Sequence, residues 1–274
     1  MLIVLAANGL SAVASPLLVY PLGLGLSGSA VANVAAQAVA TVLFVRALSR
    51  TGVDRRPDRA VMRAQLTMGR DLFVRAAAFQ AAFLTAAAVA ARMGTAQLGA
   101  HQIALQLWEF TALLLDSFAI AAQAVVGAAL GGGDIVTARH TAWRVARYGL
   151  WAGIAFGAAI GAGALVLPPL FTDSPSVIHQ AHLLWPWFAG MQPAAGVVFA
   201  LDGVLIGAGD VAFMRTLTVA AAVGAFVPLD LAALHWHWGI GGVWAGLTAF
   251  VVVRLVGMLI RTARGHWAVA GEQR

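Results

Sequence analysis

Two acidic residues interrupt a long apolar segment of the chain. Between residues 95 and 131 four polar side chains recur at intervals of seven residues: Gln102, Glu109, Asp116 and Gln123. Seven residues return an α-helix to within about 20° of its starting azimuth, so the four side chains share one helix face. Gln106 widens this polar stripe one turn after Gln102. The stripe predicts that two carboxyl groups lie inside an otherwise apolar helix.

A carboxyl group at membrane depth is rare and usually functional. Such a group can bind and release a proton or a cation as its surroundings open to one side of a membrane and then to the other. Glu109 and Asp116 are the two residues for which we expect this chemistry. The alternative is that both carboxyl groups only hydrogen-bond to neighbouring helices and hold the bundle together.

The composition places these residues in a membrane protein. Hydrophobic residues make up 61% of the 274 positions and charged residues 10%, against roughly 25% in soluble domains. The mean hydropathy is +0.85. We therefore predict an all-α integral membrane protein, a polytopic helix bundle in a lipid bilayer. The net charge of +6 does not predict a nucleic-acid partner, because the arginines lie mainly in loops and at helix ends.

The apolar segments predict eight transmembrane helices, since a span needs about 20 apolar residues. They lie at approximately 2–21, 27–47, 72–91, 96–130, 144–171, 182–208, 212–233 and 239–262. The arginine-rich linker at 48–70 marks a boundary between two bundles, one of two helices (1–47) and one of six helices (71–274).

Arginine distribution predicts the orientation. The second loop carries seven arginines between residues 46 and 70, which makes it cytoplasmic by the positive-inside rule. Alternation along the eight spans then places both termini in the cytoplasm. All seventeen basic residues are arginine, and alanine and glycine are abundant, which is typical of a GC-rich bacterial genome. We expect the inner (plasma) membrane of a bacterium.

Further polar residues lie inside the other apolar segments. Asp202 is a third acid, and Gln192 and the kink-forming Pro193 precede it by about three turns. Arg254 needs an acidic partner, for which Asp202 and Glu109 are both candidates. We expect Arg75 to pair with Asp71, one turn earlier on the same helix. The alternative to a role in transport is that these side chains only form ion pairs or pack between helices.

A glycine-rich octapeptide that ends in aspartate occurs twice, at 127–134 and at 203–210. Each copy predicts a glycine at a helix end followed by an N-cap, so Asp134 and Asp210 are expected to cap the next helix. Repeats in parallel orientation are typical of secondary transporters built from two related bundles.

The sequence predicts no enzyme and no resident cofactor or metal. Cysteine is absent, and no phosphate-binding loop, dinucleotide fingerprint or catalytic triad occurs in a suitable context. The histidine pairs His179/His182 and His235/His237 lie among tryptophans, where membrane-interface side chains settle. No carboxylate lies at ligand spacing from either pair.

Five segments together resemble the multidrug and toxin extrusion (MATE) family, most closely its DinF-like branch. They are Gly69–Arg75, Ala100–Trp108, Leu115–Gly127, Leu201–Asp210 and Gly242–Arg254. The resemblance implies twelve helices in two six-helix lobes, which export cationic or amphipathic compounds in exchange for protons or sodium. This chain is similar to the last eight of those helices and lacks the first four.

Two departures from the family pattern bear on the expected mechanism. The family often has an acid before the proline in the first helix seen here, where this chain has Ser15, and glutamate where it has Gln123. Coupling to protons or sodium would therefore rest on Glu109, Asp116 and Asp202.

Three alternatives remain beside a monomeric antiporter of small molecules. A lipid-precursor flippase of the same superfamily would need several arginines in its cavity, and only Arg254 is a candidate. An intramembrane enzyme would need a converging nucleophile or metal set. The third alternative is a truncated chain that folds poorly and transports nothing.

Overall fold

The computed structural model describes residues 2–21, 23–50 and 58–270, and every regular element in these ranges is a helix. The chain divides into two compact units, residues 1–62 and residues 63–274. The two units are therefore described separately.

The first unit is a helical hairpin. Helix α1 (Leu2–Val19) packs along α2 (Gly25–Ser49), and small side chains such as Ala32 and Ala36 fill the interface. Gly28 brings the two backbones together, because a Cβ at this position would lie 2.9 Å from the Leu18 carbonyl. The smallest residues thus set the closest approach in the hairpin, as is common between membrane helices.

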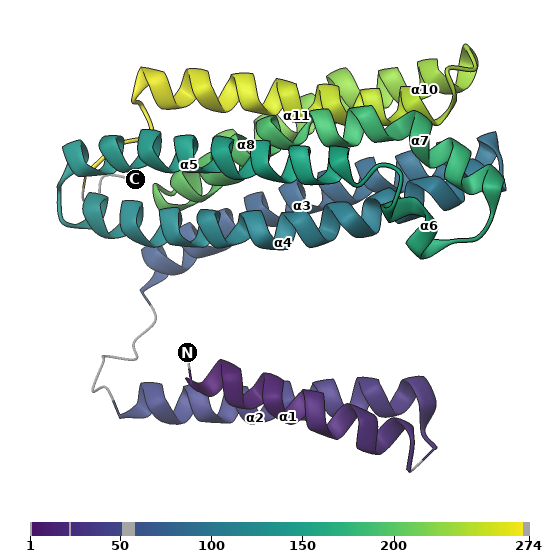
Figure 1. Ribbon diagram of the computed structural model, residues 1–274. Coiled ribbons are helices and arrows are strands. Elements are labelled where there is room, and N and C mark those ends of the chain that lie inside the picture. The colour runs from purple at the N-terminus through teal and green to yellow at the C-terminus, as the bar shows by residue number, and fades with distance from the viewer. Residues whose placement is uncertain (1, 22, 51–57, 271–274) are drawn as a thin grey trace. The chain divides into compact units, whose positions relative to one another are not determined.

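The second unit is a bundle of long helices that run roughly alongside one another (Figure 1). Its elements in chain order are α3 (Arg59–Met93), α4 (Thr95–Gly131), α5 (Ile135–Ala162), α6 (Leu167–Phe171), α7 (Pro175–Gly190), α8 (Gln192–Gly207), α9 (Val211–Ala221), the π-helical turn η1 (Ala222–Phe226), α10 (Val227–His235) and α11 (Gly239–Arg264).

The helices confirm the predicted all-α membrane fold. Among the described residues six helical segments are long and apolar enough to cross a membrane, and the bent pair α7–α8 makes a seventh. Helix α1 is apolar but shorter, and together these segments account for the eight predicted spans. The predicted span 212–233 consists of α9, η1 and α10 in continuous succession.

Several predicted boundaries were wrong. The fifth span is displaced toward the N-terminus, because α5 begins at Ile135 and ends at Ala162, and residues 167–171 form the separate short helix α6. The sixth span bends by 49° at Met191. Part of the predicted linker is helical, since α3 already begins at Arg59; residues 51–57 of that linker lie outside the described residues.

Glycines place α8 directly against α5. Gly149, Gly153 and Gly157 recur every fourth residue and form one face of α5. A Cβ on Gly149 would lie 2.9 Å from the Ala200 Cβ, and one on Gly153 would lie 2.8 Å from the Pro193 Cα. Backbone contact at this distance excludes any larger residue.

The two repeated turns differ in what their aspartates do. The Asp134 carboxylate accepts a hydrogen bond from the Thr137 N–H at 2.9 Å, which confirms the predicted N-cap of α5. Hydrogen bonding from Thr137 also lowers the pKa of Asp134. Asp210 likewise occupies the predicted N-cap position of α9, but its side chain makes no capping hydrogen bond and instead binds Arg261 of α11 at 2.7 and 3.2 Å. A bidentate, charge-assisted contact is stronger than a neutral cap.

The α5–α8 contact predicts the effect of adding one methyl group. Gly153→Ala should lower the free energy of unfolding by about 1–3 kcal/mol, the usual cost of overpacking. Gly161→Ala is the matched control on the same helix, because its nearest neighbour, the Ala189 Cβ, is 4.0 Å away. Thermal unfolding of the detergent-solubilised chain measures both. Equal midpoints for the two variants would contradict the close contact.

Candidate functional site

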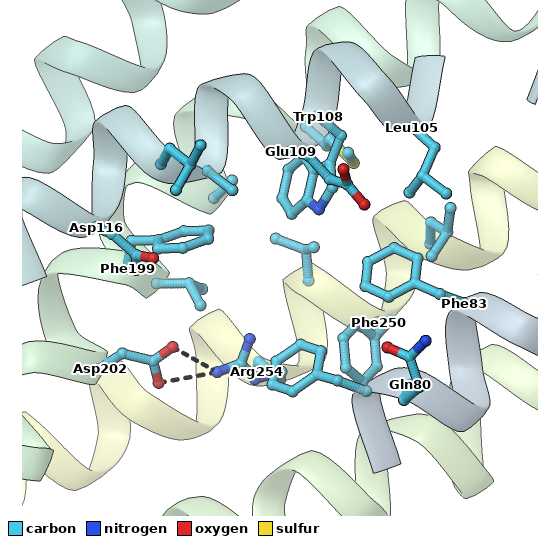
Figure 2. Close-up of a pocket in the computed structure, with 18 of the residues that line it drawn as sticks. Gln80, Phe83, Leu105, Trp108, Glu109, Asp116, Phe199, Asp202, Phe250 and Arg254 are labelled. Carbon is cyan, nitrogen blue, oxygen red and sulfur yellow. Dashed lines mark hydrogen bonds and ion pairs between the residues drawn. The ribbon is translucent and has the colours of Figure 1, made fainter. Parts of the chain in front are cut away.

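A cavity of about 670 Å³ opens between four helices of the second unit. Its walls come from α3, α4, α8 and α11, with Met191 at the α7–α8 bend. Figure 2 shows Trp108 and Glu109 on one wall and Asp202 with Arg254 on the opposite one. The cavity therefore combines aromatic, acidic and basic side chains in an apolar bundle.

Three members of the predicted polar stripe line this cavity. Gln102, Glu109 and Asp116 follow one another down the exposed face of α4. Their spacing of seven residues explains why one helix can present all three to the same space. Asp116 and Phe199 of α8 both line the cavity.

The structure does not bring Gln106 and Gln123 to the cavity wall. Gln106 is rotated by about 60° from Glu109, because three residues of an α-helix advance by about 300°. Gln123 lies where α4 and α8 converge, since a Cβ on Gly207 would come within 2.6 Å of the Gln123 carbonyl oxygen.

Asp202 joins two arginines from different helices. Its Oδ2 atom accepts a hydrogen bond from Arg75 of α3 at 2.6 Å. Arg254 of α11 donates to both carboxylate oxygens, at 2.9 and 2.8 Å. All three side chains are at most 15% exposed. The group fixes the relative positions of α3, α8 and α11.

The predicted pair between Arg75 and Asp71 was wrong. Asp71 instead accepts hydrogen bonds from its neighbour Arg70 and from Arg215 of α9, the latter at 2.5 Å. The local rule for residues four apart fails here because each side chain meets an opposite charge on another helix. For Arg254, the structure selects Asp202 from the two predicted candidates.

Aromatic rings cover the arginine side of the cavity. The Arg254 guanidinium carbon lies 4.6 Å from the centre of the Phe79 ring, and that of Arg75 lies 5.4 Å from the same centre. Phe79 meets Phe250 edge to face at 5.4 Å. Such cation–π contacts stabilise a cation that is removed from water. Across the cavity, Trp108 lies 6.1 Å from Phe199.

The formal charge of the cavity wall is negative. Three acids, Glu109, Asp116 and Asp202, face two arginines, Arg75 and Arg254, which leaves a net charge of −1. Within the described residues Glu109 and Asp116 form no ion pair. These two carboxyl groups are the ones that remain available to a bound molecule.

Gln192, which the sequence analysis placed in the transport pathway, does not line the cavity. It is buried at the start of α8, and its Nε2 atom donates to the Phe188 carbonyl oxygen at 3.3 Å. Pro193 occupies the first turn of α8, next to the bend at Met191. The bend therefore falls between two helices, and Pro193 does not kink the middle of one.

Sequence reasoning assigned Arg75 to a structural pair with Asp71 and left it out of the site, and it missed the aromatic wall. Arg75 lies within the apolar run 72–91. A charged side chain inside a membrane span needs a partner of opposite charge, and this reasoning, which was used for Arg254, holds for Arg75 as well. Phe79, Trp108, Phe199 and Phe250 gave no such signal, because aromatic residues inside an apolar helix are usually packing residues.

Comparison with known proteins gives consistent matches. The family model described as MatE matches residues 72–231. The chain is 32% identical over 268 residues to the protein DETOXIFICATION 44, chloroplastic, of Arabidopsis thaliana. The aligned residues cover 96% of this chain and 51% of that protein. It is 28% identical to the DNA damage-inducible protein F of Escherichia coli, covering 97% of this chain and 59% of that protein.

The fold matches solved structures as well. A crystal structure of MATE in complex with MaL6 superimposes with a TM-score of 0.84 at 20% identity, covering 96% of this chain and 62% of that one. The chain spans about half the length of the curated relatives named above. The family model covers most of the second unit, including α3, α4 and α8 of the cavity, and the chain belongs to the MATE family of multi-pass membrane transporters.

Proposed function

We propose that this chain acts in secondary active transport, exporting cationic or amphipathic drugs or toxins in exchange for protons or sodium. The observation that carries the proposal is the cavity, whose wall combines a net negative charge with aromatic rings. Cations bind to such surfaces through carboxylates and through ring faces. An amphipathic molecule would place its apolar part against Phe83, Leu105 and Trp108.

The roles that we propose for the three cavity acids depend on which of them already form ion pairs. Asp202 holds Arg75 and Arg254, whereas Glu109 and Asp116 face the cavity. In the proposed cycle these two carboxyl groups exchange a coupling ion for the cargo as the bundle alternates between its inward and outward states. Proton and sodium are both suited to a carboxylate site.

We further propose a bacterial plasma-membrane location, a monomeric state and cytoplasmic termini. The arginine-rich turns support the orientation through the positive-inside rule. Because the chain has no cysteine, single-cysteine variants provide a direct test. Gly133→Cys should react with a membrane-impermeant maleimide only in inverted vesicles, and Thr172→Cys only in intact cells. The reverse pattern would contradict the orientation.

The cavity carboxyl groups generate a prediction for ethidium, which is a planar cation. Glu109→Gln and Asp116→Asn should each weaken ethidium binding about tenfold, which corresponds to one charge-assisted contact of roughly 1.5 kcal/mol. Fluorescence titration of the purified full chain measures binding, and ethidium efflux from cells expressing it measures transport. Gln123→Ala, outside the cavity on the same helix, is the control.

Two outcomes would count against the proposal in different ways. Unchanged binding and efflux in both acid variants would remove Glu109 and Asp116 from the site. Ethidium binding without efflux by the unsubstituted chain would contradict transport by this chain alone and favour the non-transporting alternative.

A lipid-precursor flippase is the second candidate. It gains support from Arg75, because two arginines now line the cavity where the sequence offered only Arg254. Asp202 neutralises part of their charge, which favours the cation exporter. An anionic lipid-linked substrate that competes with ethidium, and binds more tightly in Asp202→Asn, would favour the flippase.

The arginine pair also generates a stability prediction. Asp202→Asn leaves two buried guanidinium groups without a counter-charge, which should cost about 3–5 kcal/mol. Adding Arg254→Gln to this variant removes one of the two charges and should recover part of the loss. Thermal unfolding of the three proteins measures both steps. A double variant no more stable than Asp202→Asn would show that the charges are not coupled.

A further inference from the structure

A buried acid that forms no ion pair with a described residue lies in the second unit, away from the cavity. Asp230 belongs to α10 and is completely buried. Both of its carboxylate oxygens lack a hydrogen-bond partner among the described residues. Asp230 is not among the residues that line the cavity, so the proposed transport site leaves its role open.

The position of Asp230 is a close crossing between α10 and α11. Gly242 and Gly246, four residues apart on α11, form the contact surface. A Cβ on Gly242 would lie 2.8 Å from the Ala233 Cβ, and one on Gly246 would lie 3.5 Å from Asp230 Oδ1. The carboxyl group therefore lies against the backbone of α11.

The surroundings of this carboxyl group are apolar. Phe226 and Leu229 lie next to it at the same crossing. The packed elements carry four titratable side chains: Arg254, Arg261 and Arg264 of α11 and His235 of α10. Arg254 binds Asp202 and Arg261 binds Asp210, and none of the four hydrogen-bonds to Asp230.

We propose that Asp230 is a proton-binding site, a neutral acid while α10 and α11 are packed together and ionised when they separate. An ionised carboxylate without a partner in an apolar interior costs several kcal/mol, whereas the neutral acid does not carry this cost. On separation the O–H bond breaks and the proton passes to water, leaving the carboxylate. On closure the carboxylate regains a proton from water.

A π-helical turn and a proline lie at the start of α10, close to Asp230. The turn η1 immediately precedes α10, and in it the Val227 N–H donates to the Ala222 carbonyl five residues earlier. Pro228 follows and has no N–H to donate. A π-turn beside a proline is a common place for a membrane helix to bend. Bending there changes the contact between Asp230 and Gly246.

A line of aromatic contacts joins this crossing to the cavity. Phe226 meets Phe250 edge to face at 6.2 Å. Phe250 lines the cavity and lies 5.7 Å from the guanidinium carbon of Arg254, which binds Asp202. Opening of the crossing would shift Phe250 and with it the Arg254–Asp202 pair. This coupling rests on the proposed transport function, whereas proton binding by Asp230 does not.

Infrared difference spectra of the purified full chain between acidic and alkaline pH test the proton site. We expect a protonated-carboxyl C=O band that disappears in Asp230→Asn, which is similar in shape and cannot ionise. The control Asp173→Asn, in the loop before α7, should keep this band. Spectra of Asp230→Asn identical to those of the unsubstituted chain would overturn the proposal.

A transport measurement separates this inference from the proposed function. Asp230→Asn should bind ethidium with unchanged affinity, because the cavity is intact, yet lose ethidium uptake driven by a pH gradient in proteoliposomes. If Asp230→Asn does not fold, Asp230→Glu keeps an acid and should shift the frequency of the same band. A Glu variant whose band is unmoved would overturn the proposal, whatever the outcome for ethidium export.

Discussion

The carboxylate of Asp202 is the interaction on which the second unit depends. It holds guanidinium groups from two other helices, Arg75 from α3 and Arg254 from α11, in a region that is largely removed from water. Breaking a buried pair costs about 3–5 kcal/mol because the remaining charge has no solvent. Phe79 adds its ring face to both cations. The three helices can therefore rearrange only together or by exchanging these partners.

The close packing of α8 explains why the cavity lies where it does. One side of α8 meets α5 through Gly196 and Gly149, and its C-terminal part meets α4 through Gly203 and Gly207. These backbone contacts are too close to leave room for a cavity on those two sides of α8. The remaining side of α8, with Phe199 and Asp202, faces α3 and α11 across the cavity. A small-residue helix thus supplies both the rigid core of the unit and one wall of the site.

The sequence predicted the features that depend on local periodicity. The spacing of Gln102, Glu109 and Asp116 was sufficient to place them on one face, and that face lines the cavity. Ion pairs were harder, because a choice of partner depends on helices distant in sequence. The i, i+4 rule assigned Arg75 to Asp71, whereas helix packing gave Arg75 to Asp202 and Asp71 to Arg215.

The sequence indicated that a later span could bend, but it did not indicate the residue at which the bend falls. Pro193 indicated that the sixth span could bend. The bend actually falls at Met191, where the first residues of α8 meet the glycine face of α5. Similarly, the π-turn η1 lies just before Pro228, and nothing in the local sequence Ala222–Phe226 specifies it. Packing against neighbouring helices decides these positions.

The three acids of the cavity wall and the buried Asp230 differ in what they can contribute to transport. Asp202 is already committed to two cations, so releasing it for cargo would leave both arginines unpaired. Glu109 and Asp116 face the cavity without such partners, so they can respond to a cation at little structural cost. Asp230 lies outside the cavity and hydrogen-bonds to no described residue, so in our proposal its ligand is a proton. A proton site on α10 can therefore act beside the coupling ion that Glu109 and Asp116 exchange in the cavity, and the two places are joined through Phe250 and the Asp202 group.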